Sequence, residues 1–516
     1  MASNAESVVF DIASSDGVNE SERLLTTLCR KSFLRLWAHA NLHTDKDLRS
    51  GKGSAKELCD ALVVFGNDVI IFSDKHVQFQ THKPLEVAWK RWYRGAVQES
   101  LRQLYGARSW LQRFPSRVFL DANCSRPLPV SVPDADNARY HLVAVTRGTR
   151  EASKAIFGGG IGSMIVSTEI IGERHLDSPF MVGLPDPAKG LVHVFDEASL
   201  EVIMEELDTT PDFVRDLVER DSFLSVPGRV VYAPGEEELV AAYLRNMTDE
   251  GNHCFVVIKA GEPPPDTIVF DGSHYGGLRA SVEYRRKKAA DKQSYFWDEI
   301  VNRFIRIGDP AVNSLGITTD AVDVERALRY LAAEPRFRRR ILTNALAGAL
   351  GKARAGGRVA RIARTPGAPD PAYLFLAVPK RDDESYEEYR QHRVALLHAY
   401  CRIAKLTAPE SSIFVGLAVD HPNKTYLGSS EDLLVWEQRI WDDATKNELE
   451  RMRAELEIMG PDMVITGLSD QEFPAAPGGV PRFPRDQALA HGKGHGKKKR
   501  LEKIRVQSQR RNRKRK

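Results

Sequence analysis

The first 150 residues alternate between apolar residues spaced as in a helix and apolar runs typical of strands. Leucine and aromatic residues recur at near-helical spacing between residues 20 and 37, which predicts a first helix. Two apolar runs follow, at 57–65 and 68–75, and only Gly66 and Asn67 separate them. Two strand-like runs joined by two such residues are typical of a β-hairpin.

A second long amphipathic pattern covers residues 85–114 and stops at Pro115, which cannot continue a helix. Short strand-like runs come next, at 117–121 and 140–146. The N-terminal part therefore predicts the order helix, hairpin, helix, strand, strand.

Strand-like and helix-like patterns alternate through the rest of the chain. They predict strands at 180–184, 191–195, 254–259 and 267–270 and helices at 197–208, 211–222 and 236–247. Farther along they predict a helical stretch at 320–356, a linker at 355–371, strands at 373–378 and 413–419, and helices at 383–406 and 431–458. Because strands and helices alternate, the expected fold class is α/β.

The chain of 516 residues exceeds what one hydrophobic core usually supports, so several domains are expected. We predict a flexible N-terminus, a core of helix, hairpin and helix, an α/β middle domain, a helical segment with a linker, a C-terminal α/β domain and a disordered tail. These six parts cover residues 1–18, 19–170, 171–310, 311–368, 369–468 and 469–516.

Cysteine spacing and hydropathy argue against several classes of protein. The cysteines form no CxxC pair or Cys/His cluster, which argues against a zinc site and a disulfide framework: Cys29, Cys59, Cys124, Cys254 and Cys401. No apolar window approaches the roughly 20 residues of a membrane span, and the first residues do not resemble a signal peptide. We therefore expect a cytoplasmic protein with reduced thiols and no membrane contact.

The net charge of +4 conceals a division between a basic tail and an acidic body. Residues 493–516 hold thirteen Lys or Arg and one acid, Glu502, so this stretch carries +12 and the remaining chain −8. Such a run is expected to be disordered and to attract polyanions, although a merely solubilising extension is the alternative. The candidate nucleic-acid contacts in it are Lys497, Lys498, Lys499, Arg500, Arg510 and Arg511.

Counting outward from the two-residue turn sets the register of the predicted hairpin. Phe65 then faces Asp68, and Asp60 lies opposite Ser73. Because side chains alternate between the two faces of a strand, Asp60, Ser73 and Lys75 share one face. Diagonal neighbours on adjacent strands lie about 7–8 Å apart, so Asp60 and the long Lys75 side chain can contact one ligand.

Asp60 and Lys75 lie in strands that are otherwise apolar on both faces, and such strands belong in the interior of a sheet. A buried charge is costly unless it is paired or binds a metal. One interpretation is a structural ion pair, or strand ends that reach solvent. The other is a hydrolytic phosphodiester site in which Asp60 holds Mg²⁺ and Lys75 steadies the nucleophile or the developing charge.

The hairpin segment, over about residues 20–146, resembles the PD-(D/E)XK nuclease superfamily, which has the restriction-endonuclease-like fold. The resemblance implies that Asp60 matches the first metal-binding Asp of the family. It also implies that Ser73-Asp74-Lys75 matches the acid-x-Lys triplet, with Lys75 in its usual place.

The same resemblance implies that the helix 85–114 is the second core helix of the family, from which Gln103 would face the site. It also implies an N-terminal restriction-endonuclease-like core of helix, hairpin and helix, followed by further α/β and helical regions. The implied cofactor is Mg²⁺ or Mn²⁺, and the implied partner is DNA or RNA.

One position departs from the family pattern, because Ser73 stands where the family has Asp or Glu. Asp74 points to the opposite face by strand alternation. Glu57 faces away for the same reason unless a bulge turns it inward, in which case it becomes a second catalytic and metal-binding residue. Glu20 or Glu22 on the first helix is a further substitute for the missing acid.

Two other features predict architecture rather than chemistry. The glycine-dense segment 157–163 lacks the ending of a P-loop, which favours a tight structural turn. The basic clusters 285–288 and 336–340 are able to contact phosphates, but such runs are more often solvated helix surface.

Together these patterns lead to the hypothesis of a metal-dependent nuclease that hydrolyses phosphodiester bonds in DNA or RNA, in defence or repair. Two alternatives stay open. The first is a catalytically inactive nuclease-like protein that binds nucleic acid, and the second is a protein-interaction scaffold.

Overall fold

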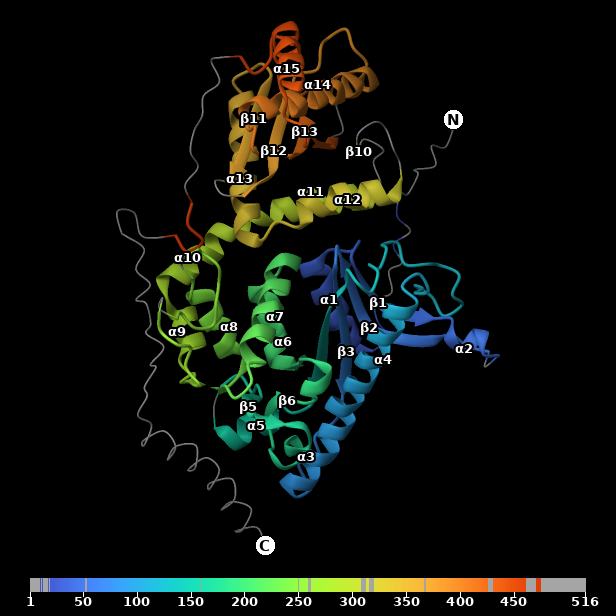
Figure 1. Cartoon of the computed structure of the whole chain (residues 1–516), viewed down its shortest axis with the longest axis vertical. Helices are drawn as coiled ribbons and strands as arrows, with labels where there is room; N and C mark the ends of the chain where they lie inside the picture. The colour runs from blue at the N-terminus through green and yellow to red at the C-terminus, as the bar shows by residue number, and fades with distance from the viewer. Residues whose placement is uncertain are drawn as a thin grey trace.

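The computed structural model describes residues 10, 12, 17, 19–51, 53–158, 160–248, 250–258, 261–307, 312–314, 320–365, 368–425, 430–460 and 470–474. Over these residues the chain is a mixed α/β protein with three mixed sheets (Figure 1). The α/β fold class predicted from the sequence is confirmed at this level.

The first sheet has the strand order β1-β2-β3-β4-β7. Its elements and the helices before the hairpin are α1 (Glu20–Phe33), β1 (Ala38–Thr44), α2 (Lys46–Arg49), β2 (Lys56–Phe65), β3 (Asp68–His76), β4 (Arg139–Arg147) and β7 (Val192–Asp196). Strands β1, β2 and β3 run antiparallel, whereas β4 is parallel to β3 and β7 is parallel to β4. The predicted strand at 191–195 therefore exists as β7 and belongs to this first sheet.

The predicted hairpin is confirmed, including its register, because Phe65 pairs with Asp68 across the turn. The first helix is shorter than predicted and ends at Phe33, since Leu34 adopts a positive φ of 63°. Strand β1 was not predicted. Its sequence, AHANLHT, carries histidines and an asparagine that hide the strand pattern, although His39 is buried in the sheet.

The long helix predicted at 85–114 is confirmed as three continuous pieces: α3 (Leu85–Tyr93), a π-helical turn (Arg94–Gln98) and α4 (Glu99–Arg113). Helix α4 packs across β2, β3 and β4. The predicted strand at 117–121 is wrong, because Phe119 forms isolated bridges to His43 and Pro127 instead of a ladder. The carboxylate of Asp121 accepts hydrogen bonds from the backbone of Asn123 and residues 125–126 and folds the chain into a turn.

The second sheet has the strand order β6-β5-β8-β9. Its strands and the helices around them are α5 (Arg150–Phe157), β5 (Ile165–Ile171), a 3₁₀ turn (Gly172–Asp177), β6 (Met181–Leu184), a 3₁₀ turn (Pro187–Lys189), α6 (Glu197–Glu206), α7 (Thr210–Leu224), β8 (Val230–Ala233), α8 (Glu236–Arg245) and β9 (Thr267–Val269). The predicted strand at 254–259 is wrong over the described residues. Asn246 binds the backbone of Cys254 and Phe255 and holds this stretch as irregular chain.

A run of helices connects the second sheet to the third. These elements are α9 (His274–Ala280), α10 (Val282–Asp291), a 3₁₀ turn (Lys292–Ser294), α11 (Tyr295–Ile307), α12 (Ala321–Ala332) and α13 (Arg336–Ala353). The helical character predicted for 320–356 is confirmed, and Pro335 divides the stretch into α12 and α13.

The third sheet has the strand order β10-β14-β13-β12-β11. Its elements are β10 (Val312–Ser314), β11 (Val359–Thr365), β12 (Ala368–Val378), α14 (Tyr386–Thr407), β13 (Ile413–Asp420), β14 (Glu431–Glu437) and α15 (Asp443–Leu456). The predicted linker at 355–371 is wrong, because β11 pairs with β12 as an edge strand. The predicted helix at 431–458 is wrong in its first half, where buried apolar residues form β14 beside β13.

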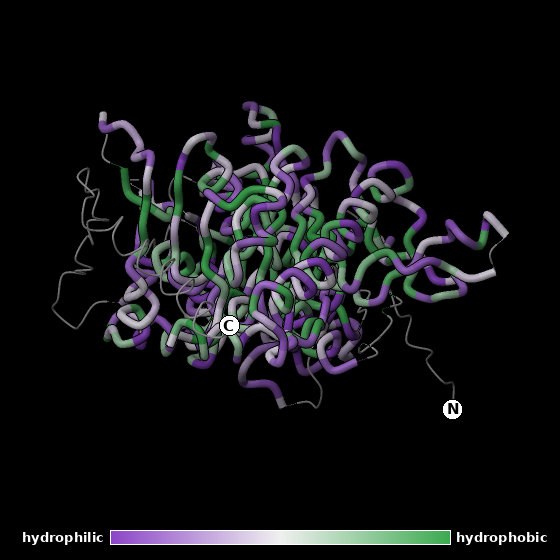
Figure 2. The backbone as a smooth tube through the Cα atoms, turned by 90° about the horizontal axis from the view of Figure 1, so that it is seen from below, coloured by the Kyte–Doolittle hydropathy of each residue, from purple (hydrophilic) through white to green (hydrophobic). Residues whose placement is uncertain are grey.

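Apolar segments lie in the interior of the molecule and polar segments cover it (Figure 2). Buried side chains of the first two sheets and of helices α11 to α13 form one continuous core, and a smaller core lies between the third sheet and α14. In the part of the chain that the structure describes, none of the helices is long and apolar enough to cross a membrane.

Candidate functional site

Asp60 on β2 and Lys75 on β3 lie in contact. The Lys75 Nζ atom is 3.4 Å from Oδ2 of Asp60, and the same oxygen accepts a hydrogen bond of 2.7 Å from the backbone N–H of Asp74. The side chain of Asp60 is 5% exposed, whereas that of Lys75 is 31% exposed. The pair is therefore anchored in the sheet at its acidic end and open to solvent at its basic end.

Strand alternation explains which helix faces the pair. Ala61 pairs with Phe72, and the Phe72 ring lies against Phe33 of α1, with ring centroids 6.2 Å apart. The neighbouring positions Asp60 and Ser73 must then point to the opposite face, toward α4. The sheet thus separates α1 from the face that carries Asp60, Ser73 and Lys75.

Ser73 contacts α4 and supplies no negative charge. Its Oγ atom donates to Oε1 of Gln103 at 2.8 Å and lies 3.1 Å from Oγ of Ser100. Ser73 is fully buried. Gln103 therefore faces the predicted side of the sheet, where it holds Ser73 in place. At the position of the second acid of the family pattern, the structure has a neutral hydrogen-bonded cluster.

Asp74 points to the other face, as strand alternation predicts. It forms a bidentate pair with Arg147 of β4, in which Nη2 of Arg147 lies 2.9 Å from Oδ2 of Asp74. Burial raises the pKa of Asp74, and the adjacent Arg147 guanidinium opposes this shift. Because both side chains are buried, the pair fixes the backbone N–H of Asp74 that orients Asp60.

A β-bulge brings Glu57 to Asp60. In the pairing of β1 with β2, Leu42 faces Cys59 but the next residue, His43, faces Glu57, so Leu58 is the extra residue. A bulge reverses the alternation of side chains beyond it. The pKa of Glu57 is raised. The largest cause is partial burial, followed by the negative charge of Asp60 and a hydrogen bond between the two carboxyls.

The acids of the first helix lie in its first turn. Glu22 accepts a hydrogen bond of 2.5 Å from Asn19, which caps α1, and its charge contributes to the raised pKa of Glu57. Glu20 lies exposed at the first position of α1. Glu57 is therefore the better substitute for the missing acid.

The carboxyls at this site suit Mg²⁺ or Mn²⁺ better than a metal ion whose ligands all come from the protein. Among the described residues, no group of three or more His, Cys, Asp or Glu side chains is arranged to hold a metal ion. Mg²⁺, however, usually binds through one or two carboxylates, several waters and the phosphates of the substrate. The bulge brings Glu57 to Asp60, and the charge of Asp60 acts on Glu57, so these two carboxyls are the candidates for such a pair.

The basic cluster at 336–340 does not form the solvated surface that its sequence predicts, whereas the cluster at 285–288 does so in part, because Arg285 is exposed and only Lys287 is buried. Arg336, Arg339 and Arg340 are buried and bind carboxylates of neighbouring helices, and Lys287 is buried beside Asp291. These cations are already paired, so they are structural and not phosphate contacts.

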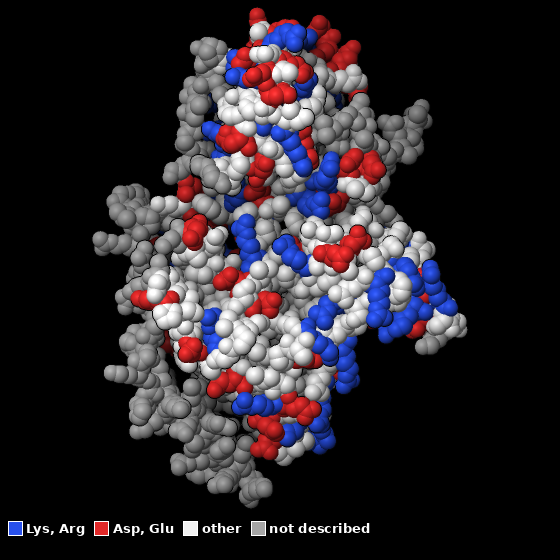
Figure 3. Space-filling model, in the orientation of Figure 1, with Lys and Arg blue, Asp and Glu red and all other residues white. Residues whose placement is uncertain are grey.

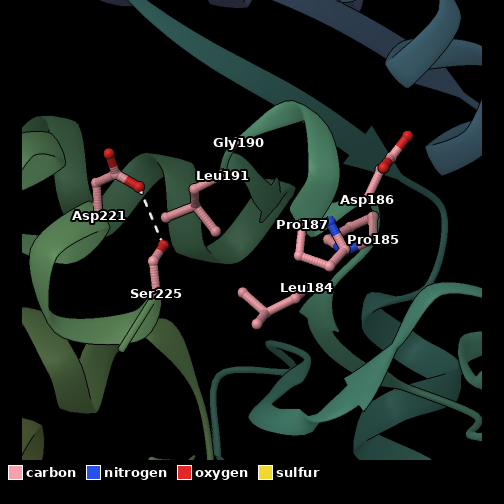
Figure 4. A pocket seen from close by; sticks show the side chains of 8 residues that line it. All are labelled: Leu184, Pro185, Asp186, Pro187, Gly190, Leu191, Asp221 and Ser225. Carbon is pink, nitrogen blue, oxygen red and sulfur yellow. Dashed lines mark hydrogen bonds between the residues drawn. The ribbon is translucent and has the colours of Figure 1, made fainter. Parts of the chain in front are cut away.

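Two further candidates lie away from the Asp60–Lys75 pair. In the described part of the glycine-dense segment, Gly158 ends α5 at a φ of 71° and Ser163 donates a hydrogen bond to Glu237, contacts that are structural. Figure 4 shows a pocket lined by Leu184, Pro185, Asp186, Pro187, Gly190, Leu191, Asp221 and Ser225. In it Asp221 accepts a hydrogen bond from Ser225, and the remaining lining is mostly apolar.

The six tail residues from Lys497 to Arg511 that the sequence suggests as nucleic-acid contacts lie outside the described residues. Comparison of the chain with models of protein families, with curated proteins and with solved structures found no match.

Proposed function

We propose that the protein is a metal-dependent nuclease of the restriction-endonuclease-like type, with its site at the hairpin β2–β3. The observation that carries this proposal is the contact between Asp60 and Lys75, with Glu57 turned to the same side by a bulge. The order α1, β1, β2, β3, α3–α4, β4, with β4 parallel to β3, supports it because the resemblance implies a helix, a hairpin, a second helix and a further strand.

In this proposal Asp60 and Glu57 hold Mg²⁺ or Mn²⁺, which when bound polarises the phosphate and lowers the pKa of water. Asp60 is kept in one orientation by the N–H of Asp74. Lys75 extends from the anchored carboxylate toward solvent, where its ammonium steadies negative charge on the phosphate oxygens. Gln103 and Ser73 fix α4 against the sheet beside the reacting groups.

The proposed substrate class is DNA or RNA. Figure 3 shows Lys and Arg side chains gathered on the protruding α2 segment, which connects β1 to β2. Lys46 and Arg49 lie on α2, and β2 begins at Lys56. Such a cluster attracts the phosphate backbone without reading sequence, and the basic stretch 493–516 would add to this attraction.

A second function has one observation in its favour. Because position 73 is a serine, the site has one acid fewer than the family pattern. The Ser73 hydroxyl is already hydrogen-bonded to α4 and does not act as a metal ligand. An inactive protein that only binds nucleic acid would have this arrangement. The third interpretation, a structural ion pair in an interaction scaffold, predicts no dependence of any nucleic-acid chemistry on Asp60.

Cleavage of supercoiled plasmid in Mn²⁺ by the full chain tests the proposal. We expect nicked or linear product from the wild type and a loss of at least about 10²-fold in rate for Asp60→Asn, which removes a charged ligand but keeps the shape of the side chain. Glu99→Gln, at a half-exposed carboxylate on α4, is the matched control and is expected to cleave normally.

Three results separate the functions. Equal cleavage by Asp60→Asn and the wild type contradicts the site. Mn²⁺-independent binding of DNA without cleavage favours the inactive binding protein. The absence of both binding and cleavage favours the scaffold.

A further inference from the structure

Residues Asp470–Phe473, which we call the strap, pack against helices that lie far away in the sequence. Figure 1 shows this short red segment beside α10. Phe473 is 7% exposed and is part of the main core. The sequence predicts that these residues belong to a disordered tail, so their docked position is unexpected.

One arginine of α13 binds three consecutive residues of the strap. The Nε atom of Arg340 lies 3.0 Å from Oδ2 of Asp470, and its two terminal nitrogens donate to the backbone carbonyls of Gln471 and Glu472. The Arg340 side chain is fully buried. Its planar guanidinium thus recognises both the charge and the backbone direction of the segment.

The carboxylate of Glu472 lies between two further cations. His253 Nε2 is 2.9 Å from Oε2 of Glu472, and Lys287 Nζ is 3.5 Å from Oε1. The other ring nitrogen of His253 lies 3.0 Å from the carbonyl of Tyr243. Because both ring nitrogens face acceptors, this geometry favours the protonated imidazolium form of His253, in which both nitrogens donate.

The three cations His253, Lys287 and Arg340, which we call the socket, also interact with acids outside the strap. Asp291 of α10 contacts two of them, at 2.7 Å from Lys287 and 2.9 Å from Arg340. The charge of Asp212 acts on His253 and Lys287. The charge of Asp216 also acts on His253, although Asp216 itself is bound to Arg220. Removal of the strap therefore takes from His253 and Arg340 carboxylates that they contact directly, and a buried cation that loses such a partner is costly.

The strap supplies what the socket lacks, namely two carboxylates, two carbonyls and an aromatic ring. Lys287 Nζ lies 5.7 Å from the centre of the Phe473 ring. The strap has few residues and buries one large apolar side chain, so charge pairs provide most of its attachment. Segments held in this way open locally at a lower free energy than the core.

We propose that the socket is a binding site for an acidic segment ending in an aromatic residue, and that Asp470–Phe473 occupies it as a reversible strap. The strap ties the C-terminal end of the chain, which continues into the basic stretch 493–516, to helices α10 and α13. This inference does not depend on the nuclease proposal, because none of its residues belongs to the hairpin site.

The strap is expected to loosen as the pH rises. Burial lowers the pKa of His253, but the neighbouring Glu472 outweighs burial and raises it. The contribution of His253 to the attachment of the strap is therefore complete below the ordinary pKa of 6.5 and is lost as the pH rises above the raised pKa. Burial alone would raise the pKa of Glu472, but His253 and Lys287 lower it to about 2. The contribution of Glu472 to the attachment of the strap therefore persists down to acid pH. Other charged groups around these two are Lys287, Asp291, Asp212, Asp216, Arg340 and Asp470, and the ring of Tyr243 packs on His253.

Hydrogen exchange of the full chain, read by mass spectrometry, tests the strap. Glu472→Gln is expected to raise the exchange rate of residues 470–474, corrected for intrinsic rates, by about 10-fold or more, because a charged hydrogen-bond partner is lost. The wild type is expected to lose the same protection as the pH is raised above 6.5, because the pKa of His253 is raised from that value. Protection of β12 and β13 should not change.

Gln471→Ala is the matched control, since the structure uses the backbone carbonyl of Gln471 and its side chain is exposed. It is expected to exchange like the wild type. The proposal is overturned if Glu472→Gln exchanges like Gln471→Ala. It is also overturned if residues 470–474 exchange only together with β12 and β13, because the segment is then a permanent part of the core.

Discussion

Lys75→Met is expected to slow Mn²⁺-dependent plasmid cleavage by at least about 10²-fold, the usual effect of removing one group that stabilises charge in a transition state. Methionine keeps the length and the apolar stem of lysine but has no charge. The Lys75 ammonium is the exposed end of a pair whose other member is fixed by the sheet, so its loss removes the cation nearest to the proposed phosphate position.

The fold should survive this change, because the Lys75 side chain is 31% exposed and lies at the end of β3. Circular dichroism and the thermal midpoint would verify that it does. Lys83→Met is the matched control, since Lys83 is an exposed lysine between β3 and α3. If Lys75→Met and Lys83→Met cleave at the same rate, Lys75 has no role in the reaction.

Arg393→Leu is expected to destabilise the protein by about 3–5 kcal/mol, the usual cost of leaving buried charges without a partner. Arg393 of α14 is fully buried and binds Asp432 at 2.6 Å, Ser430 at 2.8 Å and Asp420. These partners come from β13, β14 and the residue that precedes β14, so one guanidinium joins the helix to two strands. Without it, among the described residues, Asp432 keeps only Arg390 as a cationic partner and Asp420 keeps only Lys424, and both partners are more exposed than Arg393.

The measurement is the free energy of unfolding from a urea titration followed by circular dichroism. Arg402→Leu is the control on the same helix. Arg402 pairs with Glu448, whose side chain is 53% exposed, and such surface pairs contribute about 0–1 kcal/mol. Equal losses in the two variants would contradict the structural role of Arg393.

The sequence predicts the Asp60–Lys75 contact because local rules determine it. A two-residue turn at Gly66 and Asn67 fixes the hairpin register, and strand alternation then places Asp60 and Lys75 on one face. The long helix ending at Arg113 follows in the same way from its spacing and from Pro115. These features need no knowledge of contacts between distant segments.

Other features depend on such contacts and could not be predicted. The bulge at Leu58, which turns Glu57 toward Asp60, arises from pairing with β1, and β1 itself has no clear strand pattern. The basic run 336–340 resembles a solvated surface until the buried acids of other helices are known. In the same way, Glu472 acquires its role from His253, 219 positions earlier in the chain.

The most direct test of the proposed site is the position of a bound metal ion. A crystal of the full chain soaked in Mn²⁺ is predicted to show an anomalous peak between the carboxyls of Asp60 and Glu57, within about 2.0–2.2 Å of an oxygen of each, and no such peak in Asp60→Asn crystals. An absent peak, or one that persists in Asp60→Asn, would contradict the assignment of these two residues as metal ligands.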